Sequence, residues 1–391
     1  MRVKNITIAF IAFILQINYI YSCKKDVVKL PELKFSNVSI NEGNTDLTIA
    51  KVTFTLSETT SNDVTFIYST LDGSAKSGVD YIAAMNNSLT ISSGEKSKTI
   101  EISILANNYF EFNKAFQIEL SDIKNATSTL NKLTITILND DTYLPQLLPD
   151  GYITPNTYLG MQLIWSDEFS DNQLNTEWWN YEKGASGWGN NELENYTDSK
   201  DNSYLENGNL IIKAIKGNGT NTYTSARITT KGKKEFTYGR IDIRAKLPRG
   251  KGIWPALWML GANIDQVSWP ACGEIDIMEF LGHDLSAVYS TVHYNGTGHQ
   301  SKGSKYILPT NDSFCDKYHI YTLVWQADYM IWYVDYKKYF EVRAGDIDYS
   351  AFQLKQFLIF NVAVGGNWPG NPDETTVFPQ SMTVDYVRVF K

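Results

Sequence analysis

The sequence is poor in cysteine, with three in 391 residues, at positions 23, 272 and 315. So few thiols exclude a disulfide framework as the basis of the fold. Cys272 and Cys315 could form a single bridge in an oxidising compartment, and two buried free thiols fit the sequence equally well. Because Cys272 lies two residues before Glu274, a bridge there would support that neighbourhood without taking part in its chemistry.

The sequence also lacks an excess of positive charge and any long stretch of helical periodicity. A formal net charge of -8 offers no basic face, which excludes nucleic acid as a partner. Beyond residue 160 the apolar residues form short runs typical of β-strands, such as NLIIKAIK, YHIYTLVW and FLIFNVAV. These strands are numerous enough for two stacked sheets, so we predict an all-β protein.

The one long apolar run, ITIAFIAFILQINYI, lies near the N-terminus behind two basic residues. It has the length of a signal-peptide core and is short for a membrane span. The following YSCKKD resembles a bacterial lipobox, which implies lipidation of Cys23; an ordinary secretory signal with Cys23 incidental is the alternative. We predict a lipoprotein signal peptide over 1–22, a tether over 23–33, and a membrane link only through the lipid at Cys23. The KKD resembles a surface-export signal, which implies a protein secreted or held on the outer-membrane surface of a Gram-negative, Bacteroidetes-like bacterium.

The length of the chain favours two domains, because one typical core would not serve 391 residues. Residues 34–141 alternate short β-rich segments with Gly, Asn, Asp and Ser, which indicates a small antiparallel sandwich. The blocks INEGN, YSTLDGSAKSGVDY, SGEKSKTIEISI and LNDD occur there in order and resemble a Calx-β domain, an immunoglobulin-like β-sandwich.

Calx-β domains often bind calcium through acidic loops, and the resemblance places the ligands at Glu42, Asp80, Asp140 and Asp141. The set is incomplete here, because Asn107 and Asn108 stand where the family has an acidic pair and Lys114 replaces a glutamate. Calcium favours six to eight oxygen ligands with carboxylates among them, so these changes weaken the site. We expect a spacer or adhesion module.

A linker over 142–159 and a second domain over 160–391 complete the predicted organisation. The linker contains Pro145, Pro149, Pro155 and Gly151, which we expect to preclude a regular element. In the second domain the alternating strand GRIDIRAKL buries one face and leaves Arg240, Asp242 and Arg244 on the other. We predict that this polar face lines a groove.

The segment GEIDIMEF places three carboxylates, Glu274, Asp276 and Glu279, in six residues. In a regular strand side chains alternate between faces, so Glu279 would point away from the other two. One extra residue around Ile277 and Met278 would make a β-bulge and return Glu279 to their face. We predict such a bulge, with Met278 as the extra residue.

Three carboxylates at close range cannot all ionise cheaply, so like-charge repulsion should raise at least one pKa. Glycoside hydrolysis needs this difference, with a protonated carboxyl for the leaving oxygen and an ionised one for the sugar carbon. The distance between carboxyls that separates retention from inversion is not readable from the sequence. A solvated acidic edge strand, or a metal site built from the same three groups, stays open at this point.

The residues around this segment resemble glycoside hydrolase family 16, and within it the laminarinases, or endo-1,3-β-glucanases. The blocks that carry the resemblance occur in order: LIWSDEFSDNQLNTEWWNYEKG, GWGNNELENYT, ENGNLIIKA, YTSARITTKGK, YGRIDIRAKLPRGKGIWPALWMLG, WPACGEIDIMEFLG, STVHYNG, VAVGGNWPG and FPQSMTVDYVRVF. They cover essentially all of 160–391. The resemblance implies a β-jelly-roll sandwich with a concave cleft and a retaining mechanism.

The resemblance also implies roles for individual residues. Glu274 would be the nucleophile, Glu279 the acid that later serves as base, and Asp276 the residue that holds Glu274 and modulates the position of the proton. The implied substrate-binding residues are Trp188, Asn190, Glu192, Arg227, Trp254, Trp258, His293 and Trp368, with Trp254 and Trp258 as a sugar platform. Alternatives remain for four of them: core packing for Trp254 and Trp258, an ion pair for Arg227 and a buried structural role for His293, the role also expected for His319.

Members of the family frequently hold a calcium ion on the convex face. The matching positions are Glu168, the carbonyl of Gly208, and Asp385, which would make a weak structural site, and an empty site is the alternative. No cofactor is expected for catalysis.

The sequence thus predicts a monomeric, retaining endo-glycosidase that cleaves internal β-1,3 bonds of laminarin-type β-glucans by double displacement. One alternative keeps the mechanism and changes the substrate to mixed-linkage β-glucan or a red-algal galactan, as in agarases and carrageenases, because cleft loops select the sugar. The blocks GWGNNELENYT and SARI favour glucan. A non-catalytic surface lipoprotein that binds carbohydrate or mediates adhesion is the other alternative, and the intact carboxylate trio argues against it.

Overall fold

The computed structural model describes residues 29–108, 110–141, 146–219, 222–309 and 312–391. The described chain is all-β, as predicted, apart from the short helices α1 (Ile264–Val267) and η1 (Ser350–Gln353). It forms two compact units, the larger of which contains residues 139–391 with the loops 43–45 and 107–113. None of the helices in the described residues is long and apolar enough to cross a membrane. The predicted signal peptide and Cys23 lie outside the described residues.

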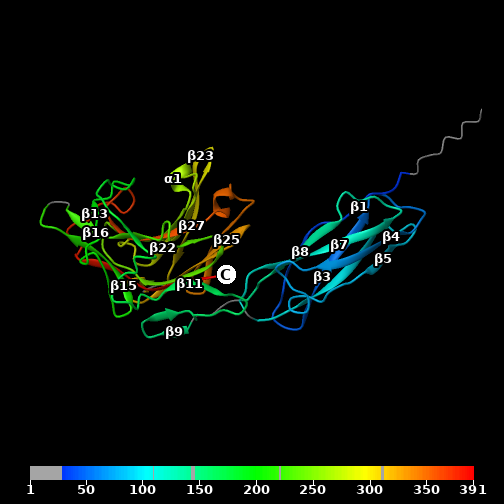
Figure 1. Ribbon diagram of the computed structural model, residues 1–391, viewed down its shortest axis with the longest axis horizontal. Helices are drawn as coiled ribbons and strands as arrows, with labels where there is room; N and C mark the ends of the chain where they lie inside the picture. The colour runs from blue at the N-terminus through cyan, green and yellow to red at the C-terminus, as the bar shows by residue number, and fades with distance from the viewer. Residues whose placement is uncertain (1–28, 109, 142–145, 220–221, 310–311) are drawn as a thin grey trace, which may run out of the picture. The chain divides into compact units, whose positions relative to one another are not determined.

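The smaller unit is a β-sandwich, drawn in blue to cyan in Figure 1. One sheet has the order β2 (Val38–Asn41), β8 (Lys132–Leu138), β7 (Lys114–Lys124), β4 (Val64–Leu71), β5 (Asn87–Ile91), and the other β1 (Leu33–Lys34), β3 (Leu47–Leu56), β6 (Ser97–Leu105). Alternate residues of the strands point inward, and Phe54, Phe66 and Phe116 from both sheets meet in the core. The Lys114 ammonium lies 2.6 Å from an Asp80 carboxylate oxygen, so one predicted calcium ligand already has a cationic partner.

The larger unit is a second sandwich, built from two larger sheets (Figure 1). The first has the order β13 (Glu194–Tyr196), β16 (Tyr223–Ser225), β15 (Asn209–Lys216), β28 (Gln380–Phe390), β19 (Gly239–Lys246), β24 (His319–Trp325), β25 (Tyr329–Val334), β26 (Lys337–Arg343), with β11 (Leu163–Asp167) on β28 and β14 (Ser203–Glu206) on β15. The second has the order β12 (Asn180–Glu182), β17 (Arg227–Thr229), β27 (Gln356–Val364), β20 (Ile253–Gly261), β21 (Glu274–Phe280), β22 (Ala287–Gly296), β23 (Gly298–Ile307), with β18 (Glu235–Phe236) on β27.

The hydrophobic core of the larger unit lies between these two sheets. Strand β19 of the ten-stranded sheet contributes Ile241 and Ile243, and β20 of the eight-stranded sheet contributes Leu257 and Met259. All four are fully buried, and each such side chain stabilises the fold by about 1.5–3 kcal/mol. The opposite face of each sheet is turned away from this core.

The predicted linker contains a hairpin, which corrects the expectation that its prolines and glycine preclude a regular element. Strands β9 (Gln146–Leu148) and β10 (Gly151–Ile153) pair antiparallel. Pro149 lies in the turn between them, where its fixed φ is favourable. Gly151 has φ +128°, and a Cβ there would lie 2.0 Å from the carbonyl oxygen of Tyr318. Pro149 therefore favours the turn, and Gly151 permits the close approach to the backbone of Tyr318.

The position of β19 corrects the prediction that Arg240, Asp242 and Arg244 line a groove, because only Arg240 borders a pocket, and that pocket is small. The strand lies in the ten-stranded sheet, and the three side chains, although on the face turned from the core, are 3%, 0% and 4% exposed. Residues of the predicted linker cover them. The Tyr158 hydroxyl donates to Asp242 at 2.5 Å, and Arg244 Nε donates to the Tyr152 carbonyl at 2.6 Å.

The Asp242→Ala variant is expected to lower the free energy of unfolding of the larger unit by about 3–5 kcal/mol. Asp242 accepts from Arg240 Nε at 2.9 Å and from the Thr322 hydroxyl at 2.7 Å, so the change removes the carboxylate that compensates a buried guanidinium. Thermal unfolding followed by near-ultraviolet circular dichroism measures the effect. The matched control is Asp198→Ala, which removes an exposed partner of Lys183 and should leave the midpoint nearly unchanged.

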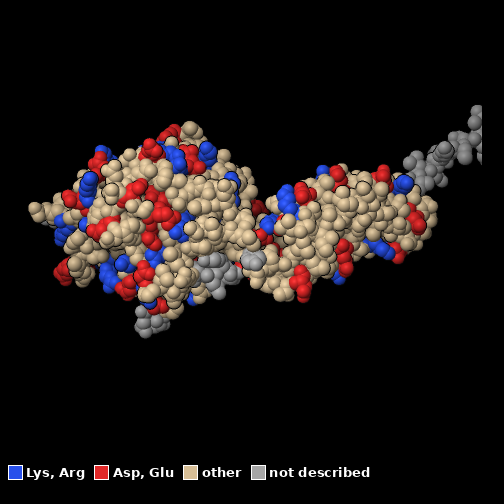
Figure 2. All heavy atoms as spheres, turned by 60° about the horizontal axis from the view of Figure 1, so that its bottom comes forward, with Lys and Arg blue, Asp and Glu red and all other residues tan. Residues whose placement is uncertain are grey.

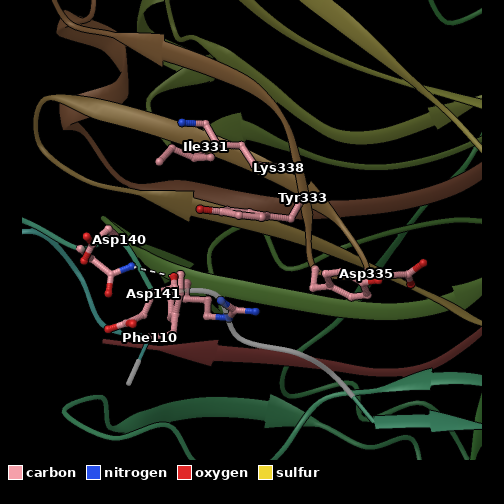
Figure 3. A pocket seen from close by; sticks show the side chains of 10 residues that line it. Phe110, Asp140, Asp141, Ile331, Tyr333, Asp335 and Lys338 are labelled. Carbon is pink, nitrogen blue, oxygen red and sulfur yellow. Dashed lines mark hydrogen bonds between the residues drawn. The ribbon is translucent and has the colours of Figure 1, made fainter. Parts of the chain in front are cut away.

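The surface of the larger unit carries mixed charge on the face that Figure 2 shows, where acidic and basic side chains are interspersed. A pocket of about 250 Å³ in this unit is lined in part by Phe110, Asp140, Asp141, Ile331, Tyr333, Asp335 and Lys338 (Figure 3). None of the predicted substrate-binding residues lines it. They line a larger cleft on the eight-stranded sheet.

Candidate active site

Seven residues of the segment GEIDIMEF, Glu274–Phe280, form β21, which lies between β20 and β22 and contains the predicted bulge. Trp258 of β20 pairs with Asp276, and Leu257 pairs with Met278. The residue without a partner on β20 is therefore Ile277, which corrects the prediction that Met278 is the extra residue.

The bulge turns two consecutive side chains, Ile277 and Met278, into the core, where they are 1% and 0% exposed. The Ser290 hydroxyl of β22 donates to the Ile277 carbonyl at 2.8 Å, which satisfies a backbone acceptor at the irregularity. With one step of alternation absorbed, Glu279 returns to the face that carries Glu274 and Asp276. Two buried apolar residues in succession thus place all three carboxylates on the same face of the strand.

The three carboxylates face a cleft with a volume of about 750 Å³. Residues of β17, β20, β21, β22 and β27 line it, so the cleft lies on the outer face of the eight-stranded sheet. The structure brings all the predicted substrate-binding residues into this cleft with the trio: Trp188, Asn190, Glu192, Arg227, Trp254, Trp258, His293 and Trp368.

Burial raises the pKa of every member of the trio. The pKa of Glu274 rises to about 8, first through burial and then through the Asp276 charge. Burial raises the pKa of Asp276 to about 8 as well. Glu279 has its pKa raised well above the ordinary value by burial and by the charges of Asp276 and Glu274. The trio therefore holds at least one proton at neutral pH, as the like-charge argument predicts.

The surroundings of Glu274 favour its ionised form more than those of its neighbours. The Trp269 indole N–H donates to Glu274 Oε2 at 2.9 Å, and His293 Nε2 lies 3.7 Å from Oε1. The charge of Arg227 also lowers the Glu274 pKa, against the raising effect of burial. Glu279 receives one weaker bond, from the Trp254 indole at 3.2 Å. We therefore place the retained proton on Glu279 and the first negative charge on Glu274.

Arg227 combines the two roles that the sequence left open. Its Nε donates to Glu182 Oε2 at 2.5 Å, so it forms an ion pair. Its guanidinium also stacks between the rings of Trp188 and Trp258, at 4.7 and 4.8 Å. Trp258 in turn donates from its indole to Asn361 Oδ1 at 2.8 Å. This stack fixes the orientation of both indoles in the cleft wall, and Trp258 is not a core residue.

At the other end of the trio, Trp368 is 41% exposed and meets Trp254 edge to face at 5.5 Å. The ring of Tyr289 in β22 also contacts the Trp368 indole, with ring centroids 5.0 Å apart. These edge contacts hold the Trp368 ring in place before a ligand binds, so little side-chain entropy is lost on binding. A ring held in this way is suited to stacking on a sugar ring. His319, by contrast, is buried and lies 3.1 Å from Asp335, which confirms its structural role.

Among the cleft residues that were not predicted, Trp269 and His299 contact Glu274 or His293. Trp269, 46% exposed, follows α1 and donates to Glu274. His299 of β23 lies with its Nε2 2.8 Å from His293 Nδ1, and its ring lies 4.5 Å from that of Trp269. The hairpin of β22 and β23 stands beside α1 in Figure 1. The signal for Trp269 was its place five residues before Glu274, whereas no sequence signal distinguishes His299.

A further carboxyl, Glu194, lies behind the cleft wall. It is fully buried, one of its oxygens accepts from the Val364 amide at 2.6 Å, and burial with the nearby Glu192 charge raises its pKa to about 8. Glu192, which lines the cleft, accepts from the Tyr196 hydroxyl at 3.1 Å and from the Asn190 amide at 3.3 Å. Glu192 and Asn190 are therefore held by a network of polar groups.

Two of the three calcium ligands predicted for the convex face are engaged with arginines. Glu168 accepts two bonds from Arg388, at 2.9 and 2.7 Å, and Asp385 accepts from Arg244 at 2.7 Å. Gly208 lies in the turn between β14 and β15. These pairings reduce the negative charge available to a cation, and calcium at these positions stays a prediction.

The question of a disulfide is settled by the structure. Cys272 and Cys315 are free thiols, and Cys272 is fully buried two residues before the start of β21. Gly273, between Cys272 and Glu274, has φ +78° and a Cβ there would lie 2.9 Å from the Ala351 side chain. The start of β21 is thus fixed by close packing and a glycine.

Two glutamates with different proton affinities, set across a bulged strand in an aromatic cleft of a β-jelly roll, have the arrangement of a glycoside hydrolase. The comparison with protein families agrees with it. The chain belongs to glycosyl hydrolases family 16, whose model matches residues 190–388. A Calx-beta domain matches residues 26–142.

Several characterised proteins are similar to the larger unit. Glucan endo-1,3-beta-glucosidase A1 of Niallia circulans is 41% identical over 269 residues, 62% of this chain and 39% of that protein. The Beta-glucanase of Rhodothermus marinus is 38% identical over 249 residues, 59% of this chain and 85% of that protein. The crystallised laminarinase catalytic domain of Thermotoga maritima is 50% identical with a TM-score of 0.56, over 59% of this chain and 98% of that domain. The chain thus spans about two fifths of the length of the Niallia circulans relative.

Proposed function

We propose that this protein is a retaining endo-β-1,3-glucanase that cleaves internal bonds of laminarin-type β-glucans. The observation that carries the proposal is the bulge at Ile277, because it places Glu274, Asp276 and Glu279 on one face of the cleft. Rigid strand positions hold such groups in reacting geometry better than loops do.

In the first step, the ionised Glu274 attacks the anomeric carbon of the sugar bound in the cleft. Glu279 gives its proton to the glycosidic oxygen as the bond between that oxygen and the carbon breaks. The products are a glycosyl ester on Glu274 and the released reducing-end portion of the chain. The higher proton affinity of Glu279 fits the acid, and the indole bond from Trp269 stabilises the negative charge that Glu274 carries once it ionises.

In the second step, water enters where the leaving sugar was. Glu279, now ionised, takes a proton from this water as its oxygen attacks the anomeric carbon, and the ester bond to Glu274 breaks. Two inversions at the same carbon give net retention. Asp276, which lies between the two glutamates in the strand and raises the pKa of both, would keep the shared proton within the trio.

The relatives support glucan as the sugar. The Thermotoga maritima neighbour is a laminarinase, and the Niallia circulans relative is a glucan endo-1,3-beta-glucosidase. The cleft walls are made of aromatic rings and amide groups, including Trp188, Trp258 and Asn361. Such walls suit a neutral glucan, since pyranose faces stack on indoles and hydroxyls pair with amides.

A panel of laminarin, lichenan, agarose and carrageenan tests the substrate. We expect new reducing ends from laminarin first, with internal cleavage seen as a rapid fall in viscosity, and β-configured products by nuclear magnetic resonance. Cleavage of lichenan alone would transfer the proposal to mixed-linkage glucan. Activity only on the galactans would overturn it, and α-configured first products would overturn the retaining mechanism.

We also propose that the protein acts at the outer-membrane surface through a lipid on Cys23, as a monomer. The lipobox-like YSCKKD supports this, although Cys23 lies outside the described residues.

A further inference from the structure

The histidine beside the trio gives the cleft a second chemical property. His293 Nε2 lies 3.3 Å from Asp276 Oδ2 and 3.7 Å from Glu274 Oε1. The other polar atoms of two of these side chains are engaged, because Trp269 donates to Oε2 of Glu274 and His299 bonds to Nδ1 of His293. Asp276 Oδ2 is buried and has no hydrogen-bond partner. Two oxygens and one nitrogen with lone pairs thus gather around one point, within 4.8 Å of one another.

The two separations from His293 Nε2 are close to those in the ligand sphere of a transition metal. A tetrahedral zinc ion holds nitrogen and oxygen ligands at about 2.0–2.2 Å, which places any two of them about 3.4 Å apart. The distances of 3.3 and 3.7 Å from His293 Nε2 therefore need shifts of only a few tenths of an ångström to fit. The donor set of one imidazole and two carboxylates suits Zn²⁺ or Cu²⁺, whereas Ca²⁺ and Mg²⁺ prefer oxygen ligands alone.

We propose that Glu274, Asp276 and His293 form a binding site for a divalent transition-metal ion, and that the bound ion inhibits the enzyme. The ion would occupy the carboxylate that attacks the sugar, with its fourth position open to the cleft. This inhibitory role rests on the proposed function, because it takes Glu274 as the nucleophile. The binding itself rests only on the geometry.

His299 is the positioning residue of this site. When its Nε2 accepts the Nδ1–H of His293, the lone pair of His293 is placed on Nε2, toward the two carboxylates. Metal-binding histidines commonly donate their second ring N–H to an acceptor in this way, which fixes the tautomer and the ring orientation. Both histidines belong to the β22–β23 hairpin, and their rings stack at 5.1 Å.

Calorimetric titration of the full chain with Zn²⁺ tests the binding. The protein is first stripped of metal, and excess Ca²⁺ is kept in the buffer to fill oxygen-only sites. We expect one Zn²⁺ per chain, competitive inhibition of laminarin hydrolysis by the same concentration range, and recovery with a chelator. Co²⁺ in place of Zn²⁺ should give the visible absorption of a four-coordinate ion.

Three variants locate the site. His293→Ala should abolish the binding, and His299→Phe, which keeps a ring without nitrogen, should weaken it about 10- to 100-fold. His283→Ala removes an exposed histidine outside the cleft and is the matched control, with binding expected to be unchanged. Circular dichroism checks that each variant is folded. Absence of binding, binding that persists in folded His293→Ala, or binding lost in His283→Ala would overturn the proposal.

Activity of the metal-free enzyme separates this inference from the proposed function. If the proposed function fails, the stripped protein does not cleave laminarin and yet binds Zn²⁺ through His293. If the inference fails, the stripped protein cleaves laminarin and Zn²⁺ does not inhibit it.

Discussion

Replacing Glu274 with glutamine is expected to lower kcat on laminarin by about six orders of magnitude, the scale on which loss of the covalent nucleophile acts in a serine hydrolase. Glutamine keeps the size of the side chain, and its carbonyl can still accept the Trp269 indole N–H, so the variant loses little besides the negative charge. Reducing-end assays measure the effect. Glu206→Gln, at an exposed position of β14 in the other sheet, is the matched control and should cleave laminarin at the wild-type rate.

The same variant should be more stable than the wild type at neutral pH. The folded protein holds the Glu274 pKa at about 8, whereas the unfolded chain has it near 4.5, so unfolding releases a proton between these values. Stability contributed by this group is therefore lost as pH rises from about 4.5 to 8, and glutamine removes that loss. Thermal unfolding should show equal midpoints at pH 4 and a higher midpoint for Glu274→Gln at pH 7. A variant that is equally destabilised at both pH values would assign its inactivity to misfolding.

The carboxylate trio shows which features of the site can be predicted from the sequence. Spacing in GEIDIMEF was enough to predict the bulge, because alternation leaves no other way to bring Glu279 to the face of Glu274. Which residue is extra depends on the pairing of β21 with β20, where Leu257 opposes Met278 and leaves Ile277 alone. The register between β20 and β21 decides which residue is unpaired, so the sequence of β21 alone does not predict it.

The error over β19 has a related cause. Alternation correctly places Arg240, Asp242 and Arg244 on one face, but it does not say to which sheet the strand belongs or what covers that face. In the structure the covering is a chain segment some 80 residues away, whose Tyr158 hydroxyl bonds to Asp242. A buried charged network and a polar groove have the same alternation in sequence.

The histidine pair shows a third limit. His293 was predicted through a resemblance, whereas His299 enters the cleft only because the β22–β23 hairpin folds back so that the two imidazoles stack. Register between paired strands creates that contact, and a six-residue spacing carries no signal of it. Groups that act on a catalytic residue from a neighbouring strand are therefore the part of a site that sequence reasoning misses most easily.

Replacing Glu279 with alanine is expected to lower kcat/KM on laminarin by about 10²- to 10⁴-fold, the usual contribution of a general acid. The loss should depend on the leaving group. Dinitrophenolate leaves without needing a proton. With a dinitrophenyl β-glucan oligosaccharide as substrate, formation of the glycosyl ester should therefore remain close to the wild-type rate, while its breakdown slows. A burst of dinitrophenol followed by a slow phase, seen by stopped-flow absorbance, is the expected record.

The pH profile of this variant should change in a definite direction. In the wild type, kcat/KM on laminarin falls at high pH as Glu279 loses its proton, at a pH above the ordinary range for a carboxyl because burial and the charges of Asp276 and Glu274 raise its pKa. Glu279→Ala should lose this alkaline limb. An unchanged limb would show that another group is the acid.

Azide distinguishes the two glutamates by the product that forms. In Glu279→Ala, azide should attack the glycosyl ester on Glu274 from the face that the acid has vacated, and release a β-glycosyl azide. In Glu274→Ala, azide should enter in place of the nucleophile and give the α-glycosyl azide directly from the dinitrophenyl substrate. Each product follows from the face on which the missing carboxylate stood, so reversal of the two anomers would exchange the roles assigned to Glu274 and Glu279.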